Sequence, residues 1–205
     1  MAPPRKHETD VILDAARALV LGGGPRAASV AAIAKSSGAP AGTLYHRFGN
    51  RDGILTAAWL RALERFQSRA MAASETGATD TADTPAETAV AMAVAAISFA
   101  REIPEDARLL LTIRPGDLLD DEPDAQFQET VATMNAPLIE RVGVLARKLY
   151  GRKDSRSVDA VARAVSDLPY AVVRRHARDE PMPSWLEADV AASVRAMLDS
   201  FGKRG

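Results

Sequence analysis

The sequence contains no cysteine among its 205 residues, so neither a disulfide bond nor a thiolate metal site is possible. Its three histidines, His7, His46 and His176, are far apart and lack the close spacing of a metal-binding motif. Aromatic residues make up only 5% of the chain. Alanine and leucine are frequent instead, and runs of β-branched residues are short. Because this composition favours helices over sheets, we expect an all-α fold.

Sequence motifs that carry enzyme chemistry are missing as well. There is no GxSxG nucleophile elbow and no GxxxxGK[ST] phosphate-binding loop. The glycine run at 22–24 is followed by Pro25 and follows no predicted strand, so it does not fit a dinucleotide-binding turn. We therefore expect that the protein is not an enzyme and has no cofactor.

Long apolar runs are also absent, and none approaches the length of a membrane span. The N-terminal residues MAPPRKHETD carry charge but are not followed by the purely apolar stretch of a secretory signal. We expect a cytoplasmic protein without a membrane partner.

Charge is unevenly distributed, although the net charge is only −1. Residues 1–70 contain ten Lys or Arg and five Asp or Glu, whereas residues 71–205 contain sixteen and twenty-two. Binding to nucleic acid requires local positive charge rather than a basic protein overall. The asymmetry fits a DNA-binding N-terminal part, and chance variation of charge along the chain is the alternative.

Residues 29–55 have the pattern of two short helices joined by a tight turn. Ser29 is a good N-cap because its hydroxyl can accept a hydrogen bond from a free backbone N–H. Gly38 permits the left-handed backbone that ends a helix in a tight turn. Leu44 and Phe48 lie four residues apart and define the inner face of the second helix. This is the pattern of a helix-turn-helix, which places its second helix in a DNA groove.

The same stretch resembles the signature of the TetR family of transcriptional regulators. That signature has a capping Thr or Ser, an Ile-Ala pair, a Gly, then G-T-[LIV]-Y-x-H-F, and a Lys before an apolar helix. Arg47 stands where the family usually has His, and Arg51 where it usually has Lys; both substitutions keep a hydrogen-bond donor that is or can be positively charged. The matching residues are Ser29, Ile33, Ala34, Gly38, Gly42, Thr43, Leu44, Tyr45, Phe48, Arg51 and Leu55.

The resemblance implies an N-terminal arm and helix-turn-helix domain in residues 1–50, followed by a connector helix and an effector-binding and dimerisation domain in residues 51–205. It further implies a homodimeric transcriptional regulator, most often a repressor, that binds a palindromic double-stranded DNA operator. A small-molecule effector would release the operator. An all-helical protein-interaction module without DNA binding is the alternative.

The expected contacts with DNA follow from the matched positions. Thr43 and Tyr45 match positions that touch phosphate or base edges in the family. Guanidinium groups bind phosphate bidentately, so both arginines of the motif are expected phosphate contacts. His46 either joins them or is an ordinary surface residue. The expected DNA-binding residues are Ser29, Pro40, Ala41, Gly42, Thr43, Tyr45, His46, Arg47 and Arg51.

About nine helices are expected. The first is capped by Thr9 or Asp10, after a flexible arm at residues 1–7. Pro137 and Pro169 predict kinks within later helices, and Ser184 is the expected N-cap of the last one. An acidic loop is expected at 117–124. The expected helices span about 9–21, 29–37, 40–48, 51–72, 86–103, 105–113, 125–150, 157–177 and 185–201.

The C-terminal part offers polar side chains between apolar ones, as a small-molecule site requires. Ordinary core or surface roles compete with ligand contact at each of them. The last two helices have long faces of apolar or small residues, which would either join two copies into a dimer or fill the core of one. The candidate ligand-binding residues are Phe99, Arg108, Thr112, Asn135, Tyr170 and Arg174.

Overall fold

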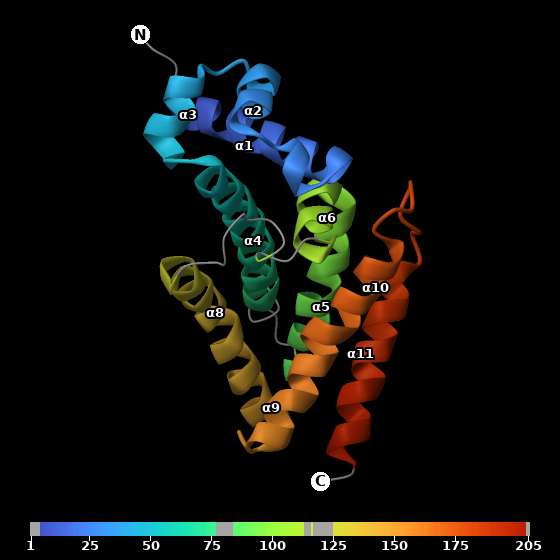
Figure 1. Cartoon of the computed structure of the whole chain (residues 1–205). Coiled ribbons are helices and arrows are strands. Elements are labelled where there is room, and N and C mark those ends of the chain that lie inside the picture. The colour runs from blue at the N-terminus through green and yellow to red at the C-terminus, as the bar shows by residue number, and fades with distance from the viewer. Residues whose placement is uncertain (1–4, 77–83, 113–115, 117–124, 204–205) are drawn as a thin grey trace. The chain divides into compact units, whose positions relative to one another are not determined.

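The computed structural model describes residues 5–76, 84–112, 116 and 125–203. Within these ranges the regular elements are all helices, as Figure 1 shows, and there is no strand. If the segments from Ser155 to His176 are counted as one continuous helix, the described part has nine helices. The predicted all-α fold is confirmed, while the predicted acidic loop at 117–124 lies outside the described residues.

The elements of the described ranges follow one another along the chain in a fixed order. They are α1 (Arg5–Gly23), the 3-10 turn η1 (Pro25–Ala27), α2 (Val30–Ser37), α3 (Ala41–Phe48), α4 (Arg51–Thr76), α5 (Pro85–Glu102), α6 (Pro104–Thr112), α8 (Ala125–Tyr150), α9 (Ser155–Ala162), the π-helical turn η2 (Arg163–Asp167), α10 (Leu168–His176) and α11 (Leu186–Gly202).

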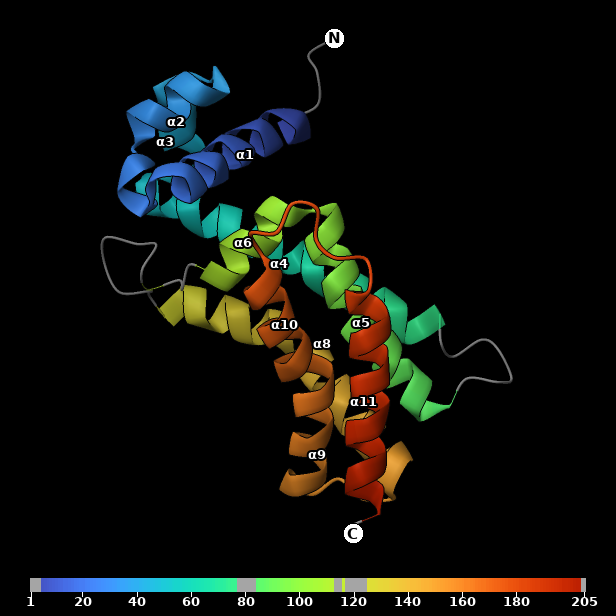
Figure 2. The ribbon, with the colours of Figure 1, turned by 90° about the vertical axis from the view of Figure 1, so that its right-hand side faces the viewer.

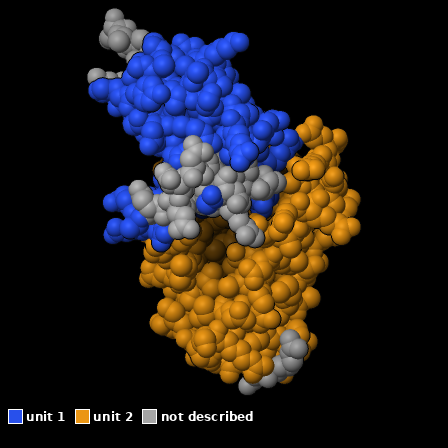
Figure 3. All heavy atoms as spheres, viewed as in Figure 1, with its two compact units in different colours: residues 1–63, 105–131 blue, residues 64–104, 132–205 orange. Residues whose placement is uncertain are grey.

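The chain forms two compact units, coloured separately in Figure 3. Unit 1 comprises residues 1–63 and 105–131, and unit 2 comprises residues 64–104 and 132–205. The long helices α4 and α8 each contribute to both units. The functional boundary predicted after residue 50 stays a prediction, since compactness does not define function.

Unit 1 is built around the packing of α1 against α2, and of α2 against α3. One apolar side chain from each of these helices is completely buried: Ile12, Ile33 and Leu44. An isolated helix of eight residues is not stable in water, because its few hydrogen bonds do not offset the free-energy cost of nucleating the helix. The shared core therefore fixes the angle between α2 and α3.

Ion pairs also connect α1 with α4 and α6 inside unit 1. The guanidinium of Arg17 pairs with the carboxylate of Asp106, which is completely buried, and lies 3.3 Å from the carboxylate of Asp14. Arg61 donates to Asp10 at 2.8 Å and to Asp14 at 2.5 Å. A buried charge is tolerated only when it is paired, so this network specifies how these three helices meet.

Unit 2 has α5 packed against α11 and against the continuous segment from α9 to α10. Figures 1 and 2 show this segment and α11 side by side and antiparallel. Ile97, Val161 and Val194 are completely buried between these helices. Arg195 forms a bidentate pair with Glu87, with both N–O distances at 2.7 Å.

Two sequence expectations about helix ends were wrong. The first helix begins at Arg5 and not at a cap near Thr9. A proline just before a helix does not prevent the helix from forming, because the backbone N–H groups of the first turn have no acceptor within the helix. The last helix begins at Leu186 with Trp185 at its N-cap and no side-chain cap bond, so Ser184 does not cap it.

The disturbance predicted at Pro169 takes the form of a wide π turn directly before it. The N–H of Leu168 bonds to the carbonyl of Arg163, five residues back. Proline has no N–H to offer the carbonyl four residues earlier, and a wider turn is one way to redistribute the remaining bonds. Helix α8, by contrast, continues through Pro137 from Ala125 to Tyr150; the kink expected there stays a prediction.

Candidate nucleic-acid interface

The turn between α2 and α3 is set by local sequence. Ser29 Oγ accepts a hydrogen bond from the backbone N–H of Ala32 at 3.2 Å, which caps the start of α2. Gly38 ends α2 in the left-handed conformation, with φ of 72°. Pro40 precedes α3 and provides no side-chain cap for it. The N–H of Thr43 donates to the carbonyl oxygen of Pro40 at 2.9 Å, so the amide groups of Ala41 and Gly42 are those at the start of α3 that can meet an anion.

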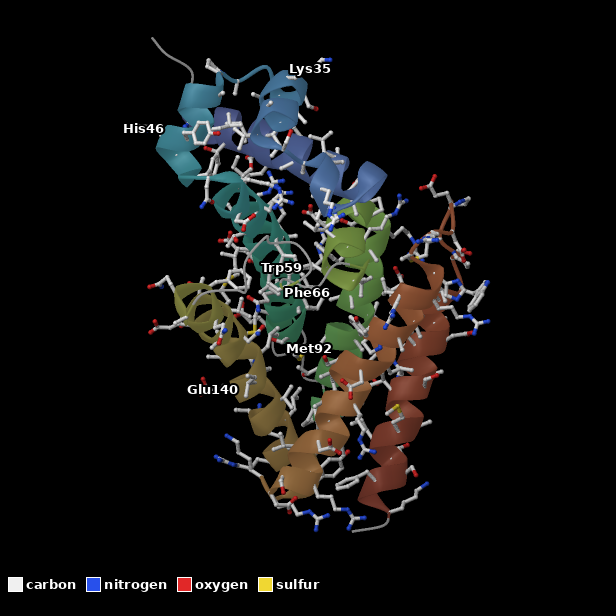
Figure 4. All side chains as sticks on the ribbon, viewed as in Figure 1. Lys35, His46, Trp59, Phe66, Met92 and Glu140 are labelled. Carbon is white, nitrogen blue, oxygen red and sulfur yellow. The ribbon has the colours of Figure 1, made fainter. Side chains whose placement is uncertain are left out.

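The outer side of α3 is exposed to an unusual degree for its residue types. The exposed fraction of Tyr45 is 54%, whereas Leu44 beside it is completely buried. Ala41, Gly42 and His46 are exposed, and Figure 4 shows His46 projecting from α3. An exposed tyrosine offers a hydroxyl and an aromatic ring, both of which are common in contacts with nucleic acid.

Gly42 is not required by the fold of the free protein. A Cβ atom built at this position would meet no other atom within 4 Å, and its backbone is not in the left-handed region. Gly53 differs, because a Cβ there would lie 2.0 Å from the carbonyl oxygen of Phe48. Gly53 is thus explained by packing inside the domain, while Gly42 leaves the surface of α3 open to close approach from outside.

The two arginines of the motif are engaged within unit 1. Arg47 donates to the hydroxyl of Thr9 on α1 at 3.1 Å. Arg51 donates to the carbonyl oxygen of Pro25 and to the carboxylate of Asp52, both at 2.7 Å. These bonds fix how α3 and α4 sit against the beginning of the chain, so in this conformation both arginines brace the domain. Contact of either arginine with DNA stays a prediction.

Lys35 is a cation of this surface that the sequence analysis missed. It lies exposed in the last turn of α2, and Figure 4 shows it projecting outward. Lys35 follows the apolar Ile33 by two residues on a short amphipathic helix, which places it on the opposite, polar side. This spacing was the signal available in the sequence. The structure therefore adds Lys35 to Ser29, Thr43 and Tyr45 as a group able to meet phosphates.

The six candidate ligand-binding residues do not share one environment. Phe99 is buried in unit 2, where its ring meets the edge of Phe66 at 5.6 Å between centroids. Asn135 accepts a hydrogen bond of 2.7 Å from the buried Gln67. Tyr170 and Arg174 are exposed on α10.

The remaining two candidates, Arg108 and Thr112, belong to α6 in unit 1. Arg108 is partly buried, and the side chain of Thr112 lies outside the described part of the chain. Ligand contact by any of the six stays a prediction.

No group of three or more His, Asp or Glu in the described residues has a geometry that could hold a metal ion. None of the described helices combines the length and the apolar character required to cross a bilayer.

Comparison with known proteins identifies the region that carries this surface. Residues 12–58 match the sequence profile of the bacterial regulatory proteins of the tetR family. The match begins in α1 and ends in α4, so it spans the helix-turn-helix and parts of the helices before and after it. A search of curated protein sequences found no match.

Similar solved structures extend over nearly the whole chain. A tetR family transcription regulator from Shewanella sp. PV-4, described as putative, has a TM-score of 0.69 at 18% identity, covering 93% of this chain and 95% of that one. The fatty acid degradation regulator FadR from Bacillus halodurans has a TM-score of 0.67 at 16% identity, covering 92% and 96%. FadR from Bacillus subtilis, solved in complex with stearoyl-CoA, has a TM-score of 0.60 at 16% identity, covering 93% and 95%. At these identities, the likeness establishes the fold.

Proposed function

Because the chain is a transcriptional regulator of the tetR family by its residues 12–58, we propose that it is a homodimeric repressor that binds a palindromic operator and leaves it when a small molecule is bound. The observation that carries the proposal is the open outer end of α3, with its uncapped start and its exposed Tyr45. A repressor must reach DNA, so we place its action in the cytoplasm.

Each helix-turn-helix is proposed to lie with α3 in a major groove. The first amide groups of α3 and the side chains of Ser29, Lys35 and Tyr45 would contact phosphates. Pro40, Ala41 and Gly42 present only carbon atoms and backbone to the base edges, so direct readout is limited to apolar contact with thymine methyl groups. Thr43 and His46 are the side chains left to read bases by hydrogen bonding.

The face of α11 turned to solvent supports the homodimer. Small side chains recur there at helical spacing and allow another helix to approach closely. The exposed side of α10 adds an aromatic ring, Tyr170, of which 46% is exposed. In a dimer this ring would be covered. A two-fold dimer presents two α3 helices and thus requires a palindromic site. The small exposed residues of α11 are Ala188, Ala192, Ser193, Ala196 and Ser200.

The effector is proposed to be largely apolar. The known complex of the structurally similar Bacillus subtilis FadR contains stearoyl-CoA, whose acyl chain is apolar. In the present chain, the rings of Trp59 and Phe127 meet in a T-shaped contact inside unit 1, and both residues are buried. Sites lined by aromatic and other apolar side chains suit apolar ligands.

The test is selection of bound sequences from a random duplex library by the purified protein, followed by a salt titration on the enriched duplex. We expect one palindrome and a steep loss of affinity with increasing salt, because phosphate contacts release counterions. Ala192→Glu is the matched variant for the dimer. It should give a folded monomer with weakened operator binding, measured by ultracentrifugation and by gel shift.

A folded dimer that enriches no sequence would refute the proposal. That result would favour the alternative, an all-helical interaction module whose helix-turn-helix does not bind DNA.

A further inference from the structure

Trp59 carries a buried indole N–H that has no hydrogen-bond partner. The residue lies on α4 within unit 1, and only 8% of it is exposed; Figure 4 labels it on that helix. Its ring meets the edge of Phe127 from the start of α8, with 5.9 Å between centroids and 60° between planes. Phe127 is also 8% exposed, so the pair forms an apolar surface inside the unit.

The other buried nitrogens without partners are of a different kind. In the described residues these are the Nε atoms of Arg17, Arg61 and Arg152. The end nitrogens of Arg17 and Arg61 pair with carboxylates, and Arg152 Nε lies 3.4 Å from the carboxylate of Asp154. Their charges are therefore compensated. The indole has a single polar atom, so at Trp59 the whole hydrogen-bonding capacity of the side chain is unused.

An unused donor in a protein interior is costly, since it gives up its hydrogen bond to water and gains none. Phenylalanine or leucine would fill an apolar position without that penalty. Positions that break such a rule are concentrated at functional sites, where the missing partner arrives with a ligand.

We propose that Nε1 of Trp59 donates a hydrogen bond to the effector, which lies against the rings of Trp59 and Phe127. This inference rests on the proposed control by a small molecule and defines its chemistry. The indole N–H only donates, so the effector must present an acceptor: a carbonyl, carboxylate or hydroxyl oxygen. The aromatic edges beside it require that the part next to this oxygen is apolar.

The test uses the indole N–H signal of the full-length protein labelled with 15N-tryptophan. The chain has two tryptophans, Trp59 and Trp185. The signal that disappears in Trp185→Phe belongs to Trp185, whose side chain is 53% exposed, and the signal that remains belongs to Trp59. The probes are acetophenone and dodecanoate, which both combine an acceptor oxygen with an apolar part. We expect either probe to move the Trp59 signal downfield and to slow its exchange with water.

A matched pair of compounds then isolates the hydrogen bond. α-Methylstyrene has the shape of acetophenone with the oxygen replaced by a CH₂ group. In the protein, β-(3-benzothienyl)alanine in place of Trp59 keeps the bicyclic ring and removes the N–H. This replacement should lower the affinity for acetophenone roughly 2- to 10-fold, the value of one hydrogen bond, and leave that for α-methylstyrene unchanged.

The outcomes separate this inference from the proposed function. If neither probe moves the Trp59 signal, or if both compounds lose affinity equally in the replaced protein, the indole is no ligand donor and the inference fails. If a compound releases the operator without moving the Trp59 signal, the repressor proposal stands and the inference fails. If the hydrogen bond forms but no bound compound changes operator affinity, the site is confirmed and control by an effector is refuted.

Discussion

Replacing Gly42 with alanine should move stability and DNA binding in opposite directions. Gly42 is the second residue of α3, is exposed, and would present its new Cβ to open space. Alanine loses less conformational freedom than glycine in a helix, so Gly42→Ala should stabilise the fold by about 0.5–1 kcal/mol. For a chain of this size that corresponds to a rise in Tm of about 1–4 °C.

The same methyl group would separate the start of α3 from DNA. If it removes one backbone-to-phosphate hydrogen bond in each half of a dimer, at about 1.5 kcal/mol each, the loss is about 3 kcal/mol. Operator affinity should then fall roughly 150-fold. Thermal unfolding and gel shift on the same preparation measure both effects.

Gly53→Ala is the control for this experiment. A Cβ at Gly53 would lie 2.0 Å from the carbonyl oxygen of Phe48, so the fold must shift and Tm should fall. DNA binding would then weaken only together with stability. If Gly42→Ala raised Tm and bound the operator as tightly as the original protein, the start of α3 would not approach DNA and the proposed docking would be wrong.

Three further perturbations follow from the structure. Lys35→Ala should reduce the slope of log affinity against log salt concentration by about one per contact. Tyr45→Phe should weaken binding to operator and to random DNA alike and leave this slope unchanged. Equal slopes for the two variants would contradict these roles. Asp106→Asn leaves the guanidinium of Arg17 without its buried partner and should cost about 3–5 kcal/mol in urea unfolding, and a loss below about 1 kcal/mol would show that the pair is dispensable. The hydrogen bond from Arg195 lowers the pKa of Glu87 below 4.5. The stabilisation of the fold by this pair is therefore complete above pH 4.5 and is lost as the pH falls through the lowered pKa. The difference in Tm between the original protein and Glu87→Gln should therefore shrink in acid, and a constant difference would exclude this cause.

Much of the candidate DNA-binding surface was readable from the sequence because it depends on local geometry. A serine cap, a glycine in the left-handed region and two inward apolar side chains fix α2, its turn and α3 within about twenty residues. Ser29 and Gly38 take the predicted conformations, and Leu44 is buried as expected. The role of each residue toward DNA stays a prediction.

The engagement of the two motif arginines was not readable in the same way. Arg47 reaches Thr9, and Arg51 reaches Pro25, over 38 and 26 residues of chain. A sequence motif records that a donor is present, but the acceptor is chosen by the packing of α1 against the other helices. The expectation of free phosphate contacts therefore missed that both side chains already have partners.

By itself, the sequence determined the helical class, the nine helices of the described ranges within a few residues, and the helix-turn-helix. These follow from periodicity, caps and turn residues, which act over less than two helical turns. Only the tertiary structure decided that Asp106 would be buried against Arg17, that Tyr170 would face solvent, and that the indole of Trp59 would lack a partner. The physical reason is that burial and pairing depend on which distant helix supplies the neighbouring atoms, and no local pattern specifies that neighbour.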